Sequence, residues 1–155
     1  MITVANATIF AIEKHEGQLD NFGVPYIDSL MRVREALYEH GDMAQVAGVL
    51  SGILRITDTS VADLEKLGVP TVVIDAIVSV TPKPSEEYFT YIRRAFAHSM
   101  GRLVMLAIVN DRLAAIERMN NDGTLTKEER DGEVEFLRGR YIRAREFLEA
   151  VKISA

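Results

Sequence analysis

Three residues within positions 46–70 are of types that packing alone does not explain: a small hydroxyl, a glycine and a cation. The stretch reads VAGVLSGILRITDTSVADLEKLGVP, and its apolar residues recur at steps of three and four, which predicts a helix with a broad buried face. Ser51, Gly52 and Arg55 lie among these apolar positions. Such residues are odd choices for a core, since Gly alone costs about 1 kcal/mol of helix stability relative to Ala. We therefore expect the stretch to border a space that holds, or once held, something other than side chains.

The histidines do not have the spacing of a metal site. His15, His40 and His98 are scattered along the chain, and we expect His15 to hydrogen-bond a backbone carbonyl at a helix end. The absence of Cys excludes disulfides and thiolate ligands. The loop 120–129 resembles part of a calcium-binding loop but places Arg118 where a carboxylate ligand would be needed, so we interpret it as an interhelical turn. We expect no metal and no cofactor.

The stretch around Ser51 resembles the metal-dependent HD hydrolases of the RelA/SpoT type, which remove the pyrophosphate from the alarmone (p)ppGpp. Where that family has roughly AALLHDxxEDT, this chain has AGVLSGILRIT. The metal-binding His-Asp pair of the family then corresponds to Ser51-Gly52, and its Glu-Asp pair corresponds to Arg55-Ile56. The resemblance implies the helical architecture of the family without the chemistry of these residues.

A second match precedes this stretch. HEGQ at 15–18 and GVPYI at 23–27 are similar to the family's HxGQxRKxGxPYIxHP. The first metal-ligating His of the family corresponds to Ser29, and the Arg-Lys pair that packs against the nucleotide base corresponds to Asp20-Asn21. The resemblance therefore implies a loop that has the shape of the family's loop but lacks its metal-ligating His and its base-packing Arg-Lys pair.

Three further segments match in the order of the family. Residues 80–94 resemble its LT…YxxYIxR segment, and residues 140–147 resemble its closing helix. Asn110-Asp111-Arg112-Leu113 is similar to ADRLxN, so Asp111 would keep the last metal ligand while Ala115 replaces the Asn that touches the nucleotide. On this alignment at most one of the family's four ligands survives, and one carboxylate cannot hold a divalent transition metal. The resemblance implies a pseudoenzyme.

Ligand-binding residues can be assigned from the same alignment. Arg55 can neutralise phosphate oxygens by bidentate hydrogen bonds, or it can pair with Asp58 or Asp111 at a helix edge. Phe22 and Tyr26 can stack on a purine or pack their own loop. Lys83, Arg94 and Arg102 can add to a basic pocket or remain solvated. The predicted ligand-binding residues are Phe22, Tyr26, Ser29, Ser51, Arg55, Tyr88, Arg93, Asp111 and Arg112.

Helix signals are frequent in the first half of the chain, and strand signals are scarce. The apolar pattern predicts one helix over residues 3–16 and another from about residue 28 to Gly41, after which Asp42 would cap the helix of the 46–70 stretch. Ser60 and Asp63 have the spacing of a capping box. Residues 72–80 are rich in β-branched side chains, and we expect a helix there because no strand partner is evident.

The second half continues the pattern. Ser85 is expected to cap a helix after two prolines, and a long helix should span residues 99–120. Thr126 and Glu129 form a second capping-box pattern, which would open a last helix reaching Val151. The predicted fold is an all-α, HD-domain-like bundle of about seven to eight helices.

Composition is typical of one soluble domain over residues 1–155, because 48% of the residues are apolar and the chain is long enough to bury a core. The apolar run at 103–109 is too short to span a bilayer, and the N-terminus lacks the pattern of a signal peptide, so we expect a cytoplasmic protein without a membrane partner. A net charge of −5 argues against a nucleic-acid surface.

The leading hypothesis is an inactive HD-hydrolase-like protein that binds and sequesters a nucleotide or nucleotide-derived signal, as a phage-type sponge would. Without a metal-activated water, hydrolysis at neutral pH lacks its nucleophile. A protein–protein interaction module, with the old pocket filled and with homo-oligomerisation as one form, is the first alternative. A residual phosphohydrolase with relocated ligands around Asp111 is the second.

Overall fold

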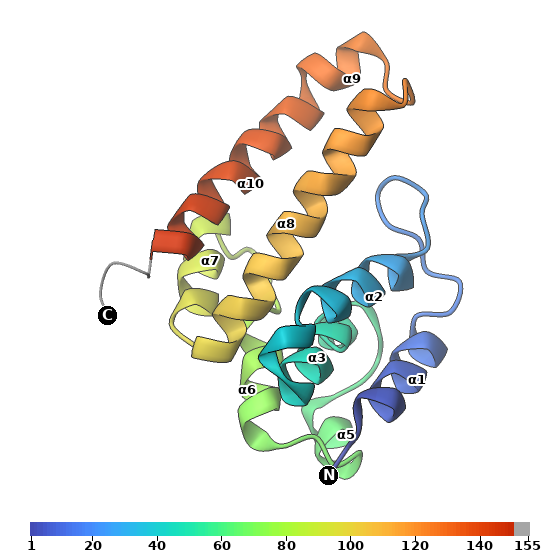
Figure 1. Cartoon of the computed structure of the whole chain (residues 1–155), viewed down its shortest axis with the longest axis vertical. Coiled ribbons are helices and arrows are strands. Elements are labelled where there is room, and N and C mark those ends of the chain that lie inside the picture. Colours follow the sequence, from blue (N-terminus) through green and yellow to red (C-terminus); the bar gives the residue numbers. More distant parts are fainter. Residues whose placement is uncertain (151–155) are drawn as a thin grey trace. The chain divides into compact units, whose positions relative to one another are not determined.

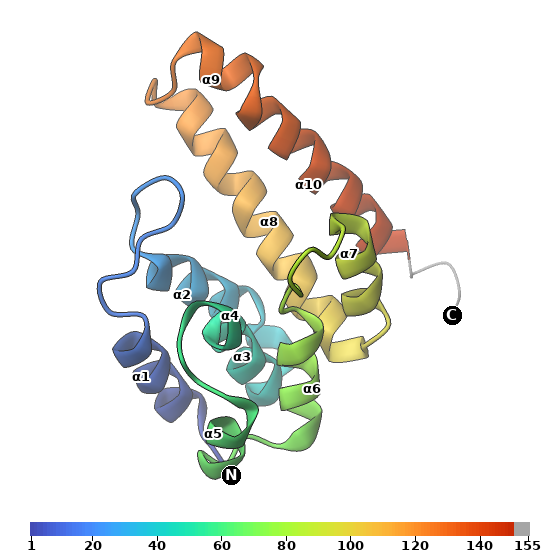
Figure 2. The ribbon, with the colours of Figure 1, turned by 180° about the vertical axis from the view of Figure 1, so that it is seen from behind.

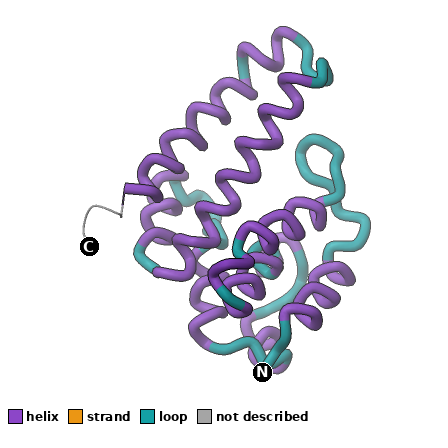
Figure 3. The backbone as a smooth tube through the Cα atoms, in the orientation of Figure 1, coloured by secondary structure: helices purple, strands orange, loops and turns teal. Residues whose placement is uncertain are grey.

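A computed structural model describes residues 1–150, which consist of helices and connecting loops (Figure 3). The chain forms two compact units, residues 1–107 and the residues from Ile108 onward. The predicted all-helical fold is confirmed, whereas the single domain stays a prediction. The helices are α1 (Val4–Lys14), α2 (Tyr26–Ala36), the 3-10 helix η1 (Tyr38–His40), α3 (Asp42–Val49), α4 (Ile53–Ile56), α5 (Val61–Lys66), α6 (Thr71–Ser79), α7 (Tyr88–Phe96), α8 (Ser99–Asn121), α9 (Lys127–Asp131) and α10 (Glu133–Glu149).

Helix α3 lies at the centre of the first unit. It packs against α1, α2 and α6 (Figure 1), and every residue from Ala44 to Val49 is buried. Gly48 allows the close approach of α2, because a Cβ there would lie 2.6 Å from Leu37 Cδ1 and 3.3 Å from Val33 Cγ1. The predicted buried face is confirmed, but the helix ends at Val49 and the chain turns before the short helix α4 begins (Figure 2).

Two helix starts in the first unit agree with the sequence pattern. The Ser60 hydroxyl accepts from the Asp63 N–H at 3.1 Å and the Asp63 carboxylate accepts from the Ser60 N–H at 2.9 Å, which confirms the capping box. Residues Thr71–Ser79 are helical despite their β-branched side chains, and Val73, Ile74 and Ile77 are buried. Packing against α3 therefore overrides the preference of the β-branched residues of α6 for a strand.

Two predicted caps are wrong. Gly41, with φ of +95°, precedes α3, and Asp42 is the first residue of the helix and makes no capping bond. Ser85 has φ of +62°, outside the range of an N-cap, and the Glu87 carboxylate accepts from the Thr90 N–H at 3.0 Å instead. In both places the helix starts where the torsions of the preceding turn allow it, rather than at the first residue with a suitable side chain.

The second unit contains the end of α8, then α9 and α10, and α10 returns alongside α8 (Figures 1 and 2). Its core contains Ile116, Leu125 and Val134 with Met119, Leu137 and Tyr141 packed around them. The capping box of Thr126 and Glu129 is confirmed. The predicted last helix is divided at Gly132, whose φ of −104° and ψ of −106° lie outside the helical region, and its expected end at Val151 lies outside the described residues.

Candidate functional site

The start of α2 and the turn between α3 and α4 meet at Gly52. Tyr26 is the first residue of α2, and its ring lies against the buried Gly52. A Cβ on residue 52 would lie 2.6 Å from the Tyr26 Oη and 2.8 Å from its Cε1, closer than real side chains approach. Glycine is therefore the residue that fits beneath this ring. Within residues 1–150 the Tyr26 hydroxyl makes no hydrogen bond.

Ser51, the residue before Gly52, is closed off from solvent. Ser51 is 6% exposed, and its hydroxyl donates a hydrogen bond to the Gly48 carbonyl oxygen at 2.8 Å. A hydroxyl that already donates to a backbone carbonyl of the preceding helix has no proton left to donate to a ligand. The structure therefore places Ser51 beside the predicted site but turns its polar group inward.

His15 also contacts the Tyr26 ring. The two ring centroids are 5.2 Å apart at an interplanar angle of 42°, and His15 is 1% exposed. Its Nδ1 bonds to Gln18 Oε1 at 2.7 Å, while Gln18 Nε2 donates to the Ile56 carbonyl oxygen at 3.0 Å. Because the Gln18 oxygen must accept, Nδ1 carries the proton in this network. The expected carbonyl partner of His15 is thus wrong, and a side-chain amide takes its place.

The His15–Gln18 pair connects the end of α1 to the end of α4. Burial lowers the pKa of His15, although the hydrogen bond to Gln18 acts in the opposite direction. The Nε2 atom is buried without a partner among the described residues. Gln18 had no role in the sequence prediction, although the HEGQ motif that contains it was the available signal. Through Gln18 this motif bonds to the last residue of α4, the helix that contains Arg55.

Arg55 lies on α4, exposed to solvent. It follows Gly52 by three positions in one helical turn, so the two residues share a face. Within residues 1–150 its guanidinium makes no hydrogen bond or ion pair. The alternative pairing with Asp58 is wrong, because the Asp58 carboxylate lies 3.7 Å from Lys14 Nζ. Arg55 thus keeps all its donors available three positions after Gly52.

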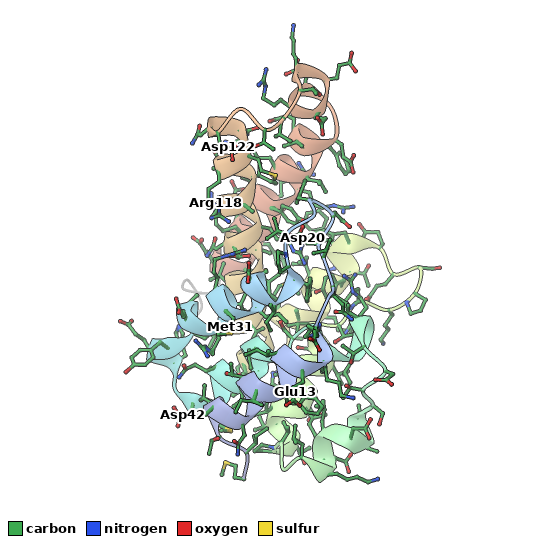
Figure 4. The ribbon with its side chains drawn as sticks, turned by 90° about the vertical axis from the view of Figure 1, so that its right-hand side faces the viewer. Glu13, Asp20, Met31, Asp42, Arg118 and Asp122 are labelled. Carbon is green, nitrogen blue, oxygen red and sulfur yellow. The ribbon has the colours of Figure 1, made fainter. Side chains whose placement is uncertain are left out.

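The loop between α1 and α2 is held by Asp20 (Figure 4). The Asp20 carboxylate accepts from the N–H groups of Phe22 at 2.8 Å and Val24 at 3.0 Å, and Gly23 has φ of +80°. Phe22 is 44% exposed on this loop, so part of its ring is accessible to a ligand or partner. Ser29 lies one turn after Tyr26 on α2 and is partly buried.

The remaining predicted residues lie on α7 and α8. The Tyr88 ring meets Phe89 and Tyr91 edge-on, with centroids 5.4 Å and 6.1 Å away, and Arg93 is exposed. Asp111 and Arg112 lie on α8 in the second unit. The structure thus gathers Tyr26, Ser51 and Arg55 around Gly52.

Arg94 has a structural role rather than the ligand-binding role that was considered for it. It bonds both oxygens of Glu86, at 2.7 and 3.0 Å, and donates to the carbonyl oxygens of Val78 at 3.0 Å and Thr81 at 2.8 Å. The bonds from Arg94 lower the pKa of Glu86 to about 2. This guanidinium therefore joins the end of α6, the following loop and α7.

Ser51 and Gly52, where the sequence resemblance implies a metal-binding His-Asp pair, do not fit a divalent metal. Gly52 has no donor atom, the Ser51 hydroxyl is bonded to the backbone, and the Tyr26 ring covers the position. Across residues 1–150, no group of three or more His, Asp or Glu side chains is placed to hold a metal ion.

Two cavities are hollowed into the first unit. The larger, of about 710 Å³, is lined by Val4, Arg34, Glu35, Ala36, Tyr38, Glu39, His40 and Gln45. The smaller, of about 340 Å³, is lined by Phe10, Lys14, Asp58, Asp63, Lys66 and Leu67. Neither cavity includes Ser51 or Arg55.

Among the described residues, the helices lack the combination of length and hydropathy that a bilayer-spanning segment needs.

No model of a known protein family matches the sequence, and no curated protein matches it. Among solved structures, the chain is similar to a metazoan protein described as an ortholog of SpoT that hydrolyses ppGpp and plays a role in starvation responses. The two are 23% identical, the match covers 92% of this chain and 94% of that chain, and the TM-score is 0.64. This likeness shows the fold, and the chain has an all-helical, HD-hydrolase-like fold.

Proposed function

We propose that this chain is a catalytically inactive HD-hydrolase-like protein that binds a phosphorylated nucleotide-derived signal and holds it without hydrolysis. The contact between Tyr26 and Gly52 carries the proposal. A carboxylate at residue 52 would require the ring to leave, which supports a site that lacks the metal-binding Asp implied by the resemblance. The structural neighbour hydrolyses ppGpp, which makes alarmones the first class of ligand to test.

Two free groups support binding on this face. The Arg55 guanidinium is exposed and makes no interaction within residues 1–150, and a guanidinium is suited to bidentate contact with phosphate oxygens. The Tyr26 hydroxyl is likewise without a hydrogen bond there and lies against the same turn. A phosphorylated ligand that reaches both groups would gain two polar contacts and a half-buried aromatic ring.

A thermal-shift screen tests the proposal. The intact protein is heated with ppGpp, GTP, GDP, ATP and cyclic nucleotides, with and without Mn²⁺, and each nucleotide is then recovered by chromatography. A ligand at about a hundred times its Kd stabilises the fold by about 2.7 kcal/mol and moves the midpoint by several degrees. We expect one class to give this shift without metal and to be recovered intact.

Two arginine variants show where the ligand binds. Arg55→Ala should abolish the shift, whereas Arg118→Ala should keep it, because Arg118 is an exposed arginine on α8 in the second unit (Figure 4). Both variants remove one exposed cation, so net charge alone cannot explain a difference between them. Metal-dependent turnover of any nucleotide would refute the inactive state, and a shift that survives Arg55→Ala would refute the site.

An interaction module is the second candidate. Leu19, Phe22 and Val24 are exposed together on the loop that Asp20 holds, and the Ser51 hydroxyl is turned inward. Exposed apolar side chains that are grouped on a fixed loop are typical of protein contacts. If no nucleotide shifts the midpoint, light scattering should show self-association that Phe22→Ser abolishes. Phe136→Ser is the control, because Phe136 is an exposed aromatic residue of the second unit.

A further inference from the structure

We infer that the larger cavity, between the start of α1, the end of α2 and η1, is a second site that binds an adenine base carrying no phosphate. Its volume of about 710 Å³ falls in the range of small-molecule pockets, roughly 300–1,000 Å³. All its lining residues belong to the first unit. The site is separate from the Tyr26 and Arg55 face, so it does not depend on the proposed function.

The wall of this cavity contains an aromatic ring without a partner. Tyr38 lies on η1 and is 73% exposed, and within residues 1–150 its ring contacts no other ring and its hydroxyl makes no hydrogen bond. A largely exposed aromatic side chain without a ring partner has a face available for a planar ligand. Aromatic side chains stack on nucleobases because both present a π surface.

A buried amide supplies the polar contacts. Gln45 lies in the first turn of α3, is 8% exposed and lines the same cavity. Its Nε2 donates to the Gly41 carbonyl oxygen at 3.5 Å, the outer limit of a hydrogen bond, which leaves one N–H and the Oε1 acceptor. An acceptor and a donor side by side match the N6 amine and the N7 atom of adenine.

The charges around the cavity disfavour a phosphate. Arg34, the cation of the lining, donates to the Thr8 hydroxyl at 3.1 Å and lies 3.9 Å from the Glu35 carboxylate, so part of its hydrogen-bonding capacity is already used. Glu39 adds a second carboxylate to the lining, Arg34 is its one Lys or Arg residue, and with His40 neutral the lining carries a net charge of −1. A phosphorylated ligand would meet net negative charge, whereas an uncharged base or nucleoside would not.

Isothermal titration calorimetry with adenosine, inosine and AMP tests this assignment on the intact protein. Adenosine should bind with one-to-one stoichiometry and at least about tenfold more tightly than inosine, which lacks the N6 amine, and AMP should bind more weakly than adenosine. Tyr38→Ala should lower adenosine affinity at least about tenfold. Phe136→Ala, another exposed aromatic change, should leave the affinity unchanged.

Three outcomes would overturn the assignment: no heat from adenosine at millimolar concentration, equal affinity for adenosine and inosine, or full affinity in Tyr38→Ala. Because the Tyr38 side chain is 73% exposed and makes no hydrogen bond or ring contact within residues 1–150, its loss should not unfold the protein, which circular dichroism checks. Arg55→Ala should bind adenosine normally. A failure at this cavity is therefore distinguishable from a failure of the proposed function.

Discussion

The contact between Tyr26 and Gly52 predicts a specific energetic coupling. In Gly52→Ala the new methyl group would lie 2.6 Å from the Tyr26 Oη, so the ring must move away from the turn and its contact with the His15 ring must change. Overpacking of this kind costs about 1–3 kcal/mol. Gly52 has ordinary torsions, φ of −100° and ψ of −2°, so Ala itself is not strained there and would otherwise stabilise by up to about 1 kcal/mol.

A double-mutant cycle measures this coupling. Gly52→Ala should destabilise the natural protein by about 1–2 kcal/mol, which is about 2–8 °C in Tm at this chain length, and should be neutral or stabilising in a Tyr26→Ala background. Urea unfolding followed by far-UV circular dichroism suits a chain that contains no Trp. Gly139→Ala on α10 is the control, because its Cβ would meet only ordinary contact at 3.4 Å. An equal cost of Gly52→Ala in both backgrounds would refute the reasoning.

Two other substitutions have expected outcomes. Glu86→Gln should cost about 1–2 kcal/mol near neutral pH, because it removes one charge of a mostly buried bidentate pair with Arg94. The folded pKa of Glu86 is depressed to about 2, so this stabilisation is full above the usual carboxyl pKa and is lost as the pH falls toward about 2. Urea midpoints of the two proteins should therefore converge in acid, and a constant gap would contradict the pairing. Gly101→Ala should cost about 1–3 kcal/mol, because its Cβ would collide with the Ser79 hydroxyl. Adding Ser79→Ala should restore part of the lost stability in thermal unfolding, and no recovery would contradict that contact.

Local patterns predicted those parts of the fold that local interactions decide. The capping boxes at Ser60 and Thr126 are complete within four residues, and both are present. The caps expected at Asp42 and Ser85 failed because side-chain type alone does not show the torsions of the preceding turn. The division at Gly132 was missed because the apolar spacing continues across it.

The candidate site was predictable in part. The polar interruption at Ser51, Gly52 and Arg55 was visible in the sequence, and the structure places all three on one turn. The ring that covers Gly52 belongs to Tyr26, far away along the chain, and no periodicity connects those positions. The inward hydroxyl of Ser51 likewise depends on a backbone carbonyl that becomes available only once α3 ends.

The loop that Asp20 fixes affects how tightly a ligand or partner can bind to Phe22. One carboxylate fixes two backbone N–H groups, so the loop reaches a defined shape during folding, without regular secondary structure. The conformational entropy of ordering the loop is then lost when the protein folds rather than when it associates with a partner or ligand. An exposed aromatic ring on such a support can enter a complex with little further loss of freedom, so its contacts contribute to affinity nearly in full.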